Sequence, residues 1–214
     1  GIVTTNNLTV AGVTTIVGQY EINNVSSGII RGTSIGIGTT NPLTPIQVGT
    51  ANSLGVPDNG YIFSVTGIGS VGIGTTVPKS HLHVEGHTKF KTYSESVESP
   101  SISSNEVTLD LSTAQTFTLT ASDDITAFVV TNPPSGSTSF TLKILQDSTG
   151  GRSVGIDTFK NNSGTSIPVY WPGGVVPIVT TTADKTDIYS FKIFDGDNLT
   201  TSGLYGVVGG QNFG

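Results

Sequence analysis

The sequence predicts an all-β protein in two parts: a homotrimeric fibrous β-stalk over residues 1–104 and a globular β-sandwich or jelly-roll-like domain over residues 105–214. Three observations lead to this prediction. Val, Ile and Thr dominate a chain that also holds 28 Gly and 10 Pro, a composition typical of short strands and many turns. No window shows helical periodicity over several turns. A short block occurs twice before residue 80, whereas regular apolar alternation begins only after residue 104.

The repeated block covers residues 34–42 and, 36 residues later, residues 70–78. Each copy contains Gly-Ile-Gly-Thr-Thr and leads into a short alternating segment, residues 46–48 or 82–84. A period of this length is typical of stacked repeats, which cannot bury their apolar face alone. Because two copies are few, we expect the missing burial to come from the same segment in neighbouring chains, wound around a common axis.

Glycines at every second position of the repeat suggest how such an axis is built. We expect them to let backbones approach closely while the apolar side chains between them point inward. The residues predicted to line the trimer axis are Ile35, Ile37, Val71, Ile73, Leu82 and Val84.

The rest of the first part contains short extended segments. Residues 1–33 alternate apolar and polar positions without enough apolar mass for a core. Residues 57–60 are a strong turn signal, and residues 61–65 are predicted to form a strand with Tyr61, Phe63 and Val65 on one face. Residues 86–104 are more polar, and we expect an exposed strand or linker with a domain boundary near Pro100.

The second part alternates regularly and is expected to hold about eight short strands, as sandwiches and jelly rolls do. The apolar segments lie at residues 107–111, 117–119, 125–130, 140–144, 154–159, 169–171, 175–179, 189–193 and 204–208, with turn signals at 132–136, 147–151 and 195–196. Five aromatic residues are expected to fill the core: Phe117, Phe128, Phe140, Trp171 and Phe191.

Composition excludes several kinds of site. The net charge is −6, and the nine basic residues are scattered, so we expect no nucleic-acid partner. Without Cys there is no disulfide, thiolate metal site or Cys nucleophile. No apolar run is long enough to insert into a membrane. The sequence begins at Gly1 rather than with Met, and we expect it to be a fragment or a processed product.

Residues 71–84 resemble a repeat of tail-fibre and other appendage proteins of tailed bacteriophages, cyanophages especially. In that family, Gly-Ile-Gly-Thr-Thr-x-Pro is followed by a strand ending in Leu-His-Val; the first copy here departs from this with Ile-Gln-Val at residues 46–48. Residues 139–142, 146–152, 169–174, 187–191 and 205–213 resemble the end domain of such fibres. The resemblance implies a homotrimeric, external virion appendage whose partners are its own copies, other virion proteins and a host-surface glycan or outer-membrane protein.

Two groups of residues are candidates for binding. His81 and His83 lie two apart in a strand, and three chains would offer six imidazoles to a transition metal at the trimer axis; otherwise no cofactor is expected. The alternative is that His83 is the usual residue of the repeat and His81 an exposed neighbour. Tyr170, Trp171 and Tyr205 are the candidate receptor-binding residues, since an aromatic ring beside Pro-Gly-Gly could stack on a sugar; Trp171 could equally lie in the core.

Enzymatic motifs are weak, and we expect no catalytic residues. Residues 32–36 match Gly-x-Ser-x-Gly, but that motif needs a strand-turn-helix unit that is missing here. Asp pairs at residues 123–124, 184 and 187, and 195 and 197 could cleave glycans, but Asp is also favoured in turns. The alternatives to a host-attaching tail fibre are a capsid decoration or neck fibre without a receptor role, and a polysaccharide-degrading tailspike.

Overall fold

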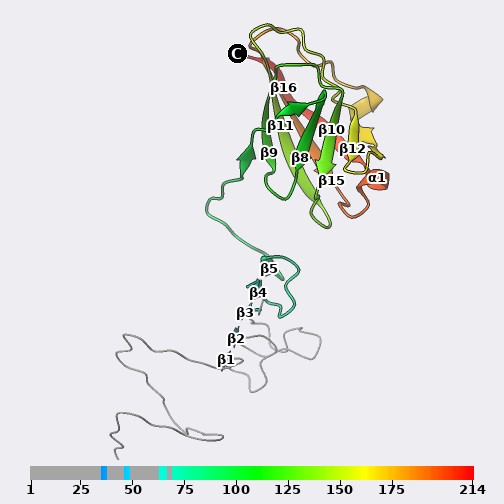
Figure 1. Ribbon diagram of the computed structural model, residues 1–214. Helices are drawn as coiled ribbons and strands as arrows, with labels where there is room; N and C mark the ends of the chain where they lie inside the picture. Colours follow the sequence, from blue (N-terminus) through cyan, green and yellow to red (C-terminus); the bar gives the residue numbers. More distant parts are fainter. Residues whose placement is uncertain (1–34, 38–45, 49–62, 67–68) are drawn as a thin grey trace, which may run out of the picture. The chain divides into compact units, whose positions relative to one another are not determined.

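The computed structural model describes residues 35–37, 46–48, 63–66 and 69–214 (Figure 1). The chain divides into two compact units, Gly1–Phe90 and Lys91–Gly214, called here the N-terminal and C-terminal units. Strands dominate the described residues, which confirms the all-β prediction. The α-helix α1 spans only Leu199–Ser202, and within the described ranges no helix could cross a membrane.

The described strands of the N-terminal unit form one five-stranded sheet, in chain order: β1 (Ile35–Ile37), β2 (Ile46–Val48), β3 (Phe63–Val65), β4 (Val71–Ile73) and β5 (Leu82–Val84). β1 pairs with β2 and β4 with β5 in parallel, and β3 runs antiparallel to both of its neighbours. Ile35 is opposite Ile46 and Val71 is opposite Leu82, so the two repeats pair their strands in the same register.

Gly72 at the centre of β4 is required by the fold of its own repeat. A Cβ there would lie 2.3 Å from the Thr75 carbonyl oxygen and 2.7 Å from Ser64 Oγ. The Ser64 hydroxyl donates a hydrogen bond to that same carbonyl, at 2.8 Å. The close approach predicted for the glycines therefore occurs at Gly72 within one chain, and contact between chains at this glycine stays a prediction.

We predict that Gly72→Ala opens the second repeat. The added methyl group meets backbone rather than a side chain that can turn away, so we expect a loss of about 2–3 kcal/mol. Amide hydrogen exchange of residues 63–84, followed by mass spectrometry, should become faster. Gly69→Ala is the control, since a Cβ there contacts nothing within 4 Å, although its φ of +83° adds strain. Equal exchange in the two variants would contradict the assignment.

The C-terminal unit consists of two sheets. Sheet I has the order β13-β12-β10-β8-β7 and contains β7 (Ile102–Ser103), β8 (Glu106–Asp110), β10 (Ala127–Thr131), β12 (Phe159–Asn161) and β13 (Ser166–Ile167). Sheet II has the order β14-β16-β15-β11-β9-β6 and contains β6 (Val97–Glu98), β9 (Thr116–Ala121), β11 (Thr138–Gln146), β14 (Val169–Tyr170), β15 (Thr186–Ile193) and β16 (Leu204–Phe213). A 3-10 turn, η1 (Pro172–Gly174), follows β14.

From β8 to β12 the chain alternates between the two sheets at every strand. Neighbours within a sheet are therefore two strands apart in sequence and run parallel: β8 with β10, β10 with β12, and β9 with β11. A jelly roll is built from antiparallel strands. The jelly-roll alternative consequently does not describe these pairs, although β15 pairs antiparallel with both β11 and β16.

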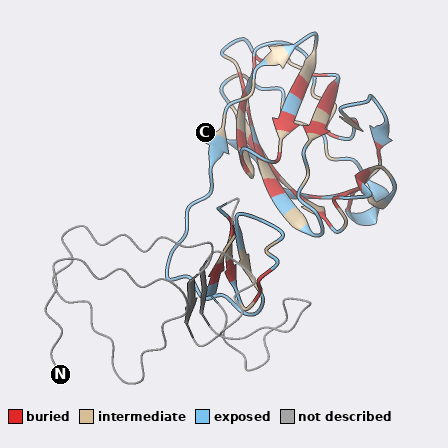
Figure 2. Cartoon of the chain, turned by 60° about the horizontal axis from the view of Figure 1, so that its bottom comes forward, coloured by how far each residue is buried: buried red, intermediate tan, exposed pale blue. Residues whose placement is uncertain are grey.

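One apolar core lies between the two sheets, and Figure 2 shows its buried residues along the strands of both. All five aromatic residues expected in the core are buried. Phe159 of sheet I and Phe191 of sheet II meet with ring centroids 5.0 Å apart, and Phe140 stacks on Phe191 at 4.9 Å. The core prediction is confirmed because strict alternation places these side chains on one face of each strand.

Three expectations differ from the structure. The C-terminal unit begins before the expected boundary at 104/105, because β6 pairs with β9 and β7 with β8. Residues 154–158 form turns at Gly155 instead of a strand, with the Ile156 amide donating to the Val154 carbonyl. Residues 175–179 form no strand either; Pro177 lacks an N–H for a ladder, and Gly173 and Gly174 before it have positive φ.

Candidate functional site

The sheet of the N-terminal unit has an uncovered apolar face. Residues paired across neighbouring strands point to the same side of a sheet, and alternate residues of one strand do so too. Phe63 is opposite Ile73, Val65 opposite Val71, Val71 opposite Leu82 and Ile73 opposite Val84. The exposed fractions of Phe63, Ile73 and Leu82 are 42%, 45% and 55%. Six apolar side chains of β3–β5 therefore form one face, called here the apolar face.

The opposite face of these strands is small and polar. It carries Ser64, Gly72 and His83, and the segment after β4 folds over it, so that Ser64 and Thr75 are buried. Burial is thus the reverse of what a self-contained domain would show, with hydroxyl groups inside and large apolar side chains outside.

The structure places Val71, Ile73, Leu82 and Val84, four of the six predicted axis residues, together on the apolar face. The side chains of Ile35 and Ile37 lie outside the described residues; their backbone register matches that of the second repeat. Phe63 and Val65 also belong to this face but were not among the predicted axis residues. Their position on one side of a predicted strand was the signal that could have identified them.

Of the two predicted metal-ligating histidines, His83 belongs to β5 and His81 precedes it. His83 lies on the polar face, its Nδ1 accepting the Lys79 amide at 3.4 Å and its Nε2 lying 3.3 Å from Glu85. His81 is exposed just before β5. His83 therefore lies on the side of β5 opposite to the apolar face, and the metal site at a trimer axis stays a prediction.

The C-terminal unit exposes a cluster of aromatic rings, Tyr170, Tyr205 and Phe194, called here the aromatic cluster. The centroid of the Tyr205 ring lies 4.9 Å from that of Tyr170 and 5.1 Å from that of Phe194. Gly203, whose φ is +74°, leaves room for the Tyr170 ring, because a Cβ atom at position 203 would lie 2.6 Å from that ring. Two of the three predicted receptor-binding residues thus lie together on the surface, and Phe194 was missed because it only continues an apolar strand pattern.

Trp171 is a core residue instead. Only 7% of it is exposed, and its ring meets Tyr189 and Phe191 edge-on. Gly206 makes room for this ring, since a Cβ there would lie 2.6 Å from it. Trp171 therefore has no free face for a sugar, and its prediction as a receptor-binding residue is wrong.

This contrast predicts losses of stability of very different size for Trp171 and Tyr205. Trp171→Ala should lower the free energy of unfolding by about 3–5 kcal/mol, because it leaves a large cavity in the core. Tyr205→Ala should lower it by less than about 1 kcal/mol, because that ring is exposed. Denaturant unfolding followed by far-ultraviolet circular dichroism measures both values, and a larger loss for Tyr205→Ala would contradict the assignment.

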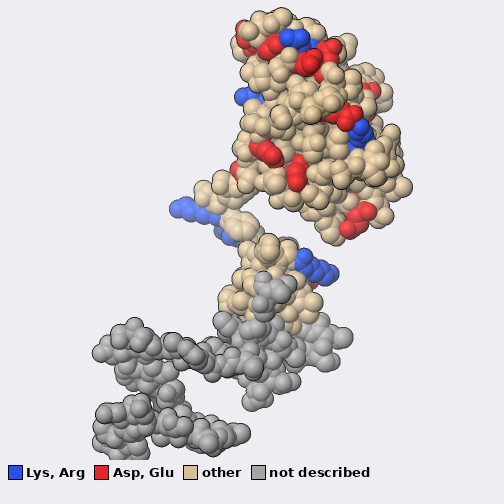
Figure 3. All heavy atoms as spheres, viewed as in Figure 1, with Lys and Arg blue, Asp and Glu red and all other residues tan. Residues whose placement is uncertain are grey.

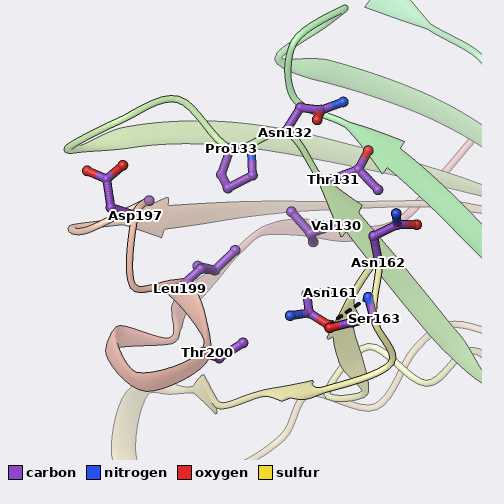
Figure 4. Close-up of a pocket in the computed structure, with 11 residues that line it drawn as sticks. Val130, Thr131, Asn132, Pro133, Asn161, Asn162, Ser163, Asp197, Leu199 and Thr200 are labelled. Carbon is purple, nitrogen blue, oxygen red and sulfur yellow. Dashed lines mark hydrogen bonds between the residues drawn. The ribbon is translucent and has the colours of Figure 1, made fainter.

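The α1 pocket, a cavity of about 550 Å³, lies among the end of β10, the turn between β12 and β13, and the first residues of α1 (Figure 4). Val130, Pro133 and Leu199 supply its apolar side. The polar side chains around it come mainly from Thr131, Asn132, Asn161, Asn162, Ser163, Asp197 and Thr200. Asn161 Oδ1 accepts the amides of Ser163 and Thr165, and its Nδ2 faces Leu199 and Thr200.

The candidate carboxylate pairs serve local structure. Asp123 Oδ1 accepts the Asp124 amide, and Asp195 Oδ1 accepts the amides of Asp197 and Asn198. Asp184 has the positive φ of a turn residue. The turn interpretation is supported for these aspartates, but it is wrong for Asp187, the partner of Asp184 in the second pair, because Asp187 is a buried residue of β15. Residues 32–34 of the Gly-x-Ser-x-Gly match lie outside the described residues.

Asp187 is the most buried carboxylate of the described residues, at 1% exposed. It accepts hydrogen bonds from the Thr180 amide at 2.8 Å, the Tyr189 hydroxyl at 2.9 Å, the Asn212 amide at 2.9 Å and Gln211 Nε2 at 3.2 Å. Burial alone would raise the pKa of Asp187, but these hydrogen bonds outweigh it and hold the pKa below its usual value. Burial raises the pKa of Tyr189, and its bond to Asp187 adds to this.

Asp147 is a half-buried residue of a turn. Its carboxylate pairs with Arg152 at 2.8 Å and accepts the amides of Thr149 and Gly150. The hydrogen bond from Arg152 lowers the pKa of Asp147. Among the residues that the structure describes, no group of three or more acidic or His side chains could hold a metal ion.

The chain matches no protein-family model, no curated protein and no solved structure. Its function is therefore inferred from the sequence pattern and from the surfaces described above.

Proposed function

We propose that this chain is the subunit of a homotrimeric, fibrous appendage of a tailed bacteriophage, a tail fibre that attaches the virion to its host through the C-terminal unit. One observation carries the proposal: the N-terminal sheet has an apolar face of six side chains, of which Phe63, Ile73 and Leu82 are exposed and the other three half-buried. An appendage of intertwined copies is the class of protein in which such a face is covered by the same face of its neighbours.

The energetics favour association of copies. Burying a Leu, Ile, Val or Phe side chain contributes about 1.5–3 kcal/mol relative to leaving it exposed. Six such side chains in each of three copies offset the conformational entropy of ordering short strands, which is about 1–2 kcal/mol per residue. One copy has no such gain, because its buried residues on the other face are hydroxyl-bearing and small.

Host attachment is assigned to the C-terminal unit because that unit has a stable core and an exposed aromatic cluster. Tyr and Phe rings give a large contact area at low entropic cost. Tyr170 and Tyr205 are both exposed, at 46% and 43%. On the face of the C-terminal unit drawn in Figure 3, Lys and Arg side chains are few and scattered. Three weak sites on one trimer would bind a repetitive host surface strongly together.

Gold-labelled antibody against the C-terminal unit, applied to virions that carry this chain, tests the place of the protein. Label at the outer ends of tail fibres supports the proposal. Label on the capsid or neck supports the decoration or neck-fibre alternative instead. Added protein should also reduce adsorption of these virions to host cells, whereas release of new reducing ends from host polysaccharide would favour the tailspike alternative.

A further inference from the structure

We propose that the α1 pocket binds a neutral sugar ring. The inference rests on the proposed function, since it names the chemistry by which the C-terminal unit attaches. The pocket has the volume of a small-molecule site, which is commonly about 300–1,000 Å³, and it combines an apolar side with convergent polar groups.

The apolar side fits one face of a sugar. Val130 and Leu199 are buried residues of the core whose side chains reach the pocket, and Pro133 adds a rigid ring beside them. A pyranose presents C–H groups on one face and hydroxyls around its edge. Burying that face against aliphatic carbon is favourable, at about 25 cal/mol per Å² of apolar area.

Unused hydrogen-bonding groups surround this apolar side. Within the described part of the chain, Asn161 Nδ2, the side-chain amide of Asn162 and the Thr200 hydroxyl have no hydrogen-bond partner. Asn161 Oδ1, by contrast, accepts the hydrogen bonds that hold the turn after β12 in place. An amide and a hydroxyl both complement sugar hydroxyls, which donate as well as accept. Because Asn161 is fixed through its oxygen, its nitrogen is held in position for a ligand.

Charge selects a neutral ligand. None of the 11 residues lining the pocket is Lys, Arg or His, and Asp197 is the single charged one. A phosphate, sulfate or uronic acid would meet a carboxylate without a cation to balance it. Asp197 Oδ2 accepts the Ser135 hydroxyl, and Oδ1 has no partner among the described residues, so it can accept a sugar hydroxyl.

Two residues of the aromatic cluster are close to the pocket segment in sequence. Phe194 and Tyr205 come directly before and after the segment 195–204, which includes α1 and forms one side of the pocket. A glycan of several units that reaches from the pocket along this segment would meet exposed rings. We expect oligosaccharides to bind more tightly than single sugars.

Saturation-transfer NMR on the full chain tests the proposal. The probes are glucose, galactose, mannose, N-acetylglucosamine, N-acetylgalactosamine and fucose at millimolar concentration, with glucuronic acid as the anionic comparison. At least one neutral sugar should show transfer. Its affinity should fall about tenfold in Asn162→Ala/Thr200→Val and in Asn161→Asp, which keeps the oxygen that holds the turn. Thr120→Val on β9 makes the same chemical change as Thr200→Val outside the pocket and should leave binding unchanged.

Three outcomes would overturn the proposal: no transfer to any neutral sugar, equal binding by the pocket variants and the native chain, or preference for glucuronic acid over glucose. Circular dichroism on each variant checks that it is folded. Sedimentation of the same samples separates this inference from the fibre proposal. A trimer that binds none of the sugars refutes the pocket assignment alone, whereas a monomer that binds them refutes the trimer and supports the pocket.

Discussion

Leu82→Asp is expected to convert the trimer to monomers. Leu82 is 55% exposed in the single chain and lies on the apolar face. If three copies bury that face, each Asp loses about 2 kcal/mol of apolar burial and adds the several kcal/mol cost of desolvating a carboxylate. Over three copies the loss exceeds about 6 kcal/mol, a factor above about 10,000 in the association constant. Sedimentation velocity at micromolar concentration measures the effect.

The matched control is His81→Asp, which adds the same side chain one residue earlier. His81 is exposed and belongs to the side of the strand away from the apolar face, so the charge should stay in water. The His81→Asp variant should remain a trimer, and its free energy of association should change by no more than about 0.5 kcal/mol. Unchanged sedimentation of Leu82→Asp, or equal dissociation of both variants, would show that the apolar face is not the contact between copies.

Asp187→Ala is expected to destabilise the C-terminal unit by about 3–5 kcal/mol. The substitution removes the acceptor of four hydrogen bonds in a buried site, and it leaves the amides of Thr180 and Asn212 without a partner. Each unsatisfied buried group costs about 1–3 kcal/mol. Trp171 is the only Trp of the chain and lies in this core, so its fluorescence follows the unfolding of the C-terminal unit.

Asp157→Ala is the control, because Asp157 is exposed and its carboxylate contacts only the neighbouring Thr158 hydroxyl, at 3.4 Å. It should change the free energy of unfolding by less than about 0.5 kcal/mol. A loss below about 1 kcal/mol for Asp187→Ala would contradict the assigned role of the carboxylate.

The same carboxylate predicts a dependence on pH. The pKa of Asp187 is lower in the folded than in the unfolded chain, so its ionised form stabilises the fold above the unfolded pKa of about 3.9. That contribution is lost as the pH falls through the folded pKa. The stability difference between the native chain and Asp187→Asn should therefore be constant above about pH 5 and shrink below about pH 4. A difference that grows on acidification would contradict the sign.

The core of the C-terminal unit could be predicted because its signal is local. Alternation along each strand places Phe117, Phe140 and Phe191 on the inward face of their own strands, and this does not depend on the order of the strands in the sheet. The same pattern held an unused signal: Asp187 lies two residues before Tyr189 and four before Phe191, on the inward side of β15. An acidic residue at an inward position of a strand indicates a buried hydrogen-bond network.

The parallel pairing and the α1 pocket could not be predicted, because both depend on residues far apart in the chain. The pocket joins residues near 130, 162 and 198, each in a turn that looks ordinary by itself. The role of Gly72 within its own repeat could not be predicted for a related reason. Alternation marks a glycine where something approaches closely, but only the fold shows that the Thr75 carbonyl of the same chain is what approaches Gly72.

The mass of the native chain in solution tests the central claim most directly. Sedimentation equilibrium at micromolar concentration should give three times the 22.0 kDa of one chain, with residues 63–84 protected from amide hydrogen exchange. A particle of 22.0 kDa in which those residues are equally protected would contradict the account, because a single chain would then hold its exposed apolar face in water without loss of structure.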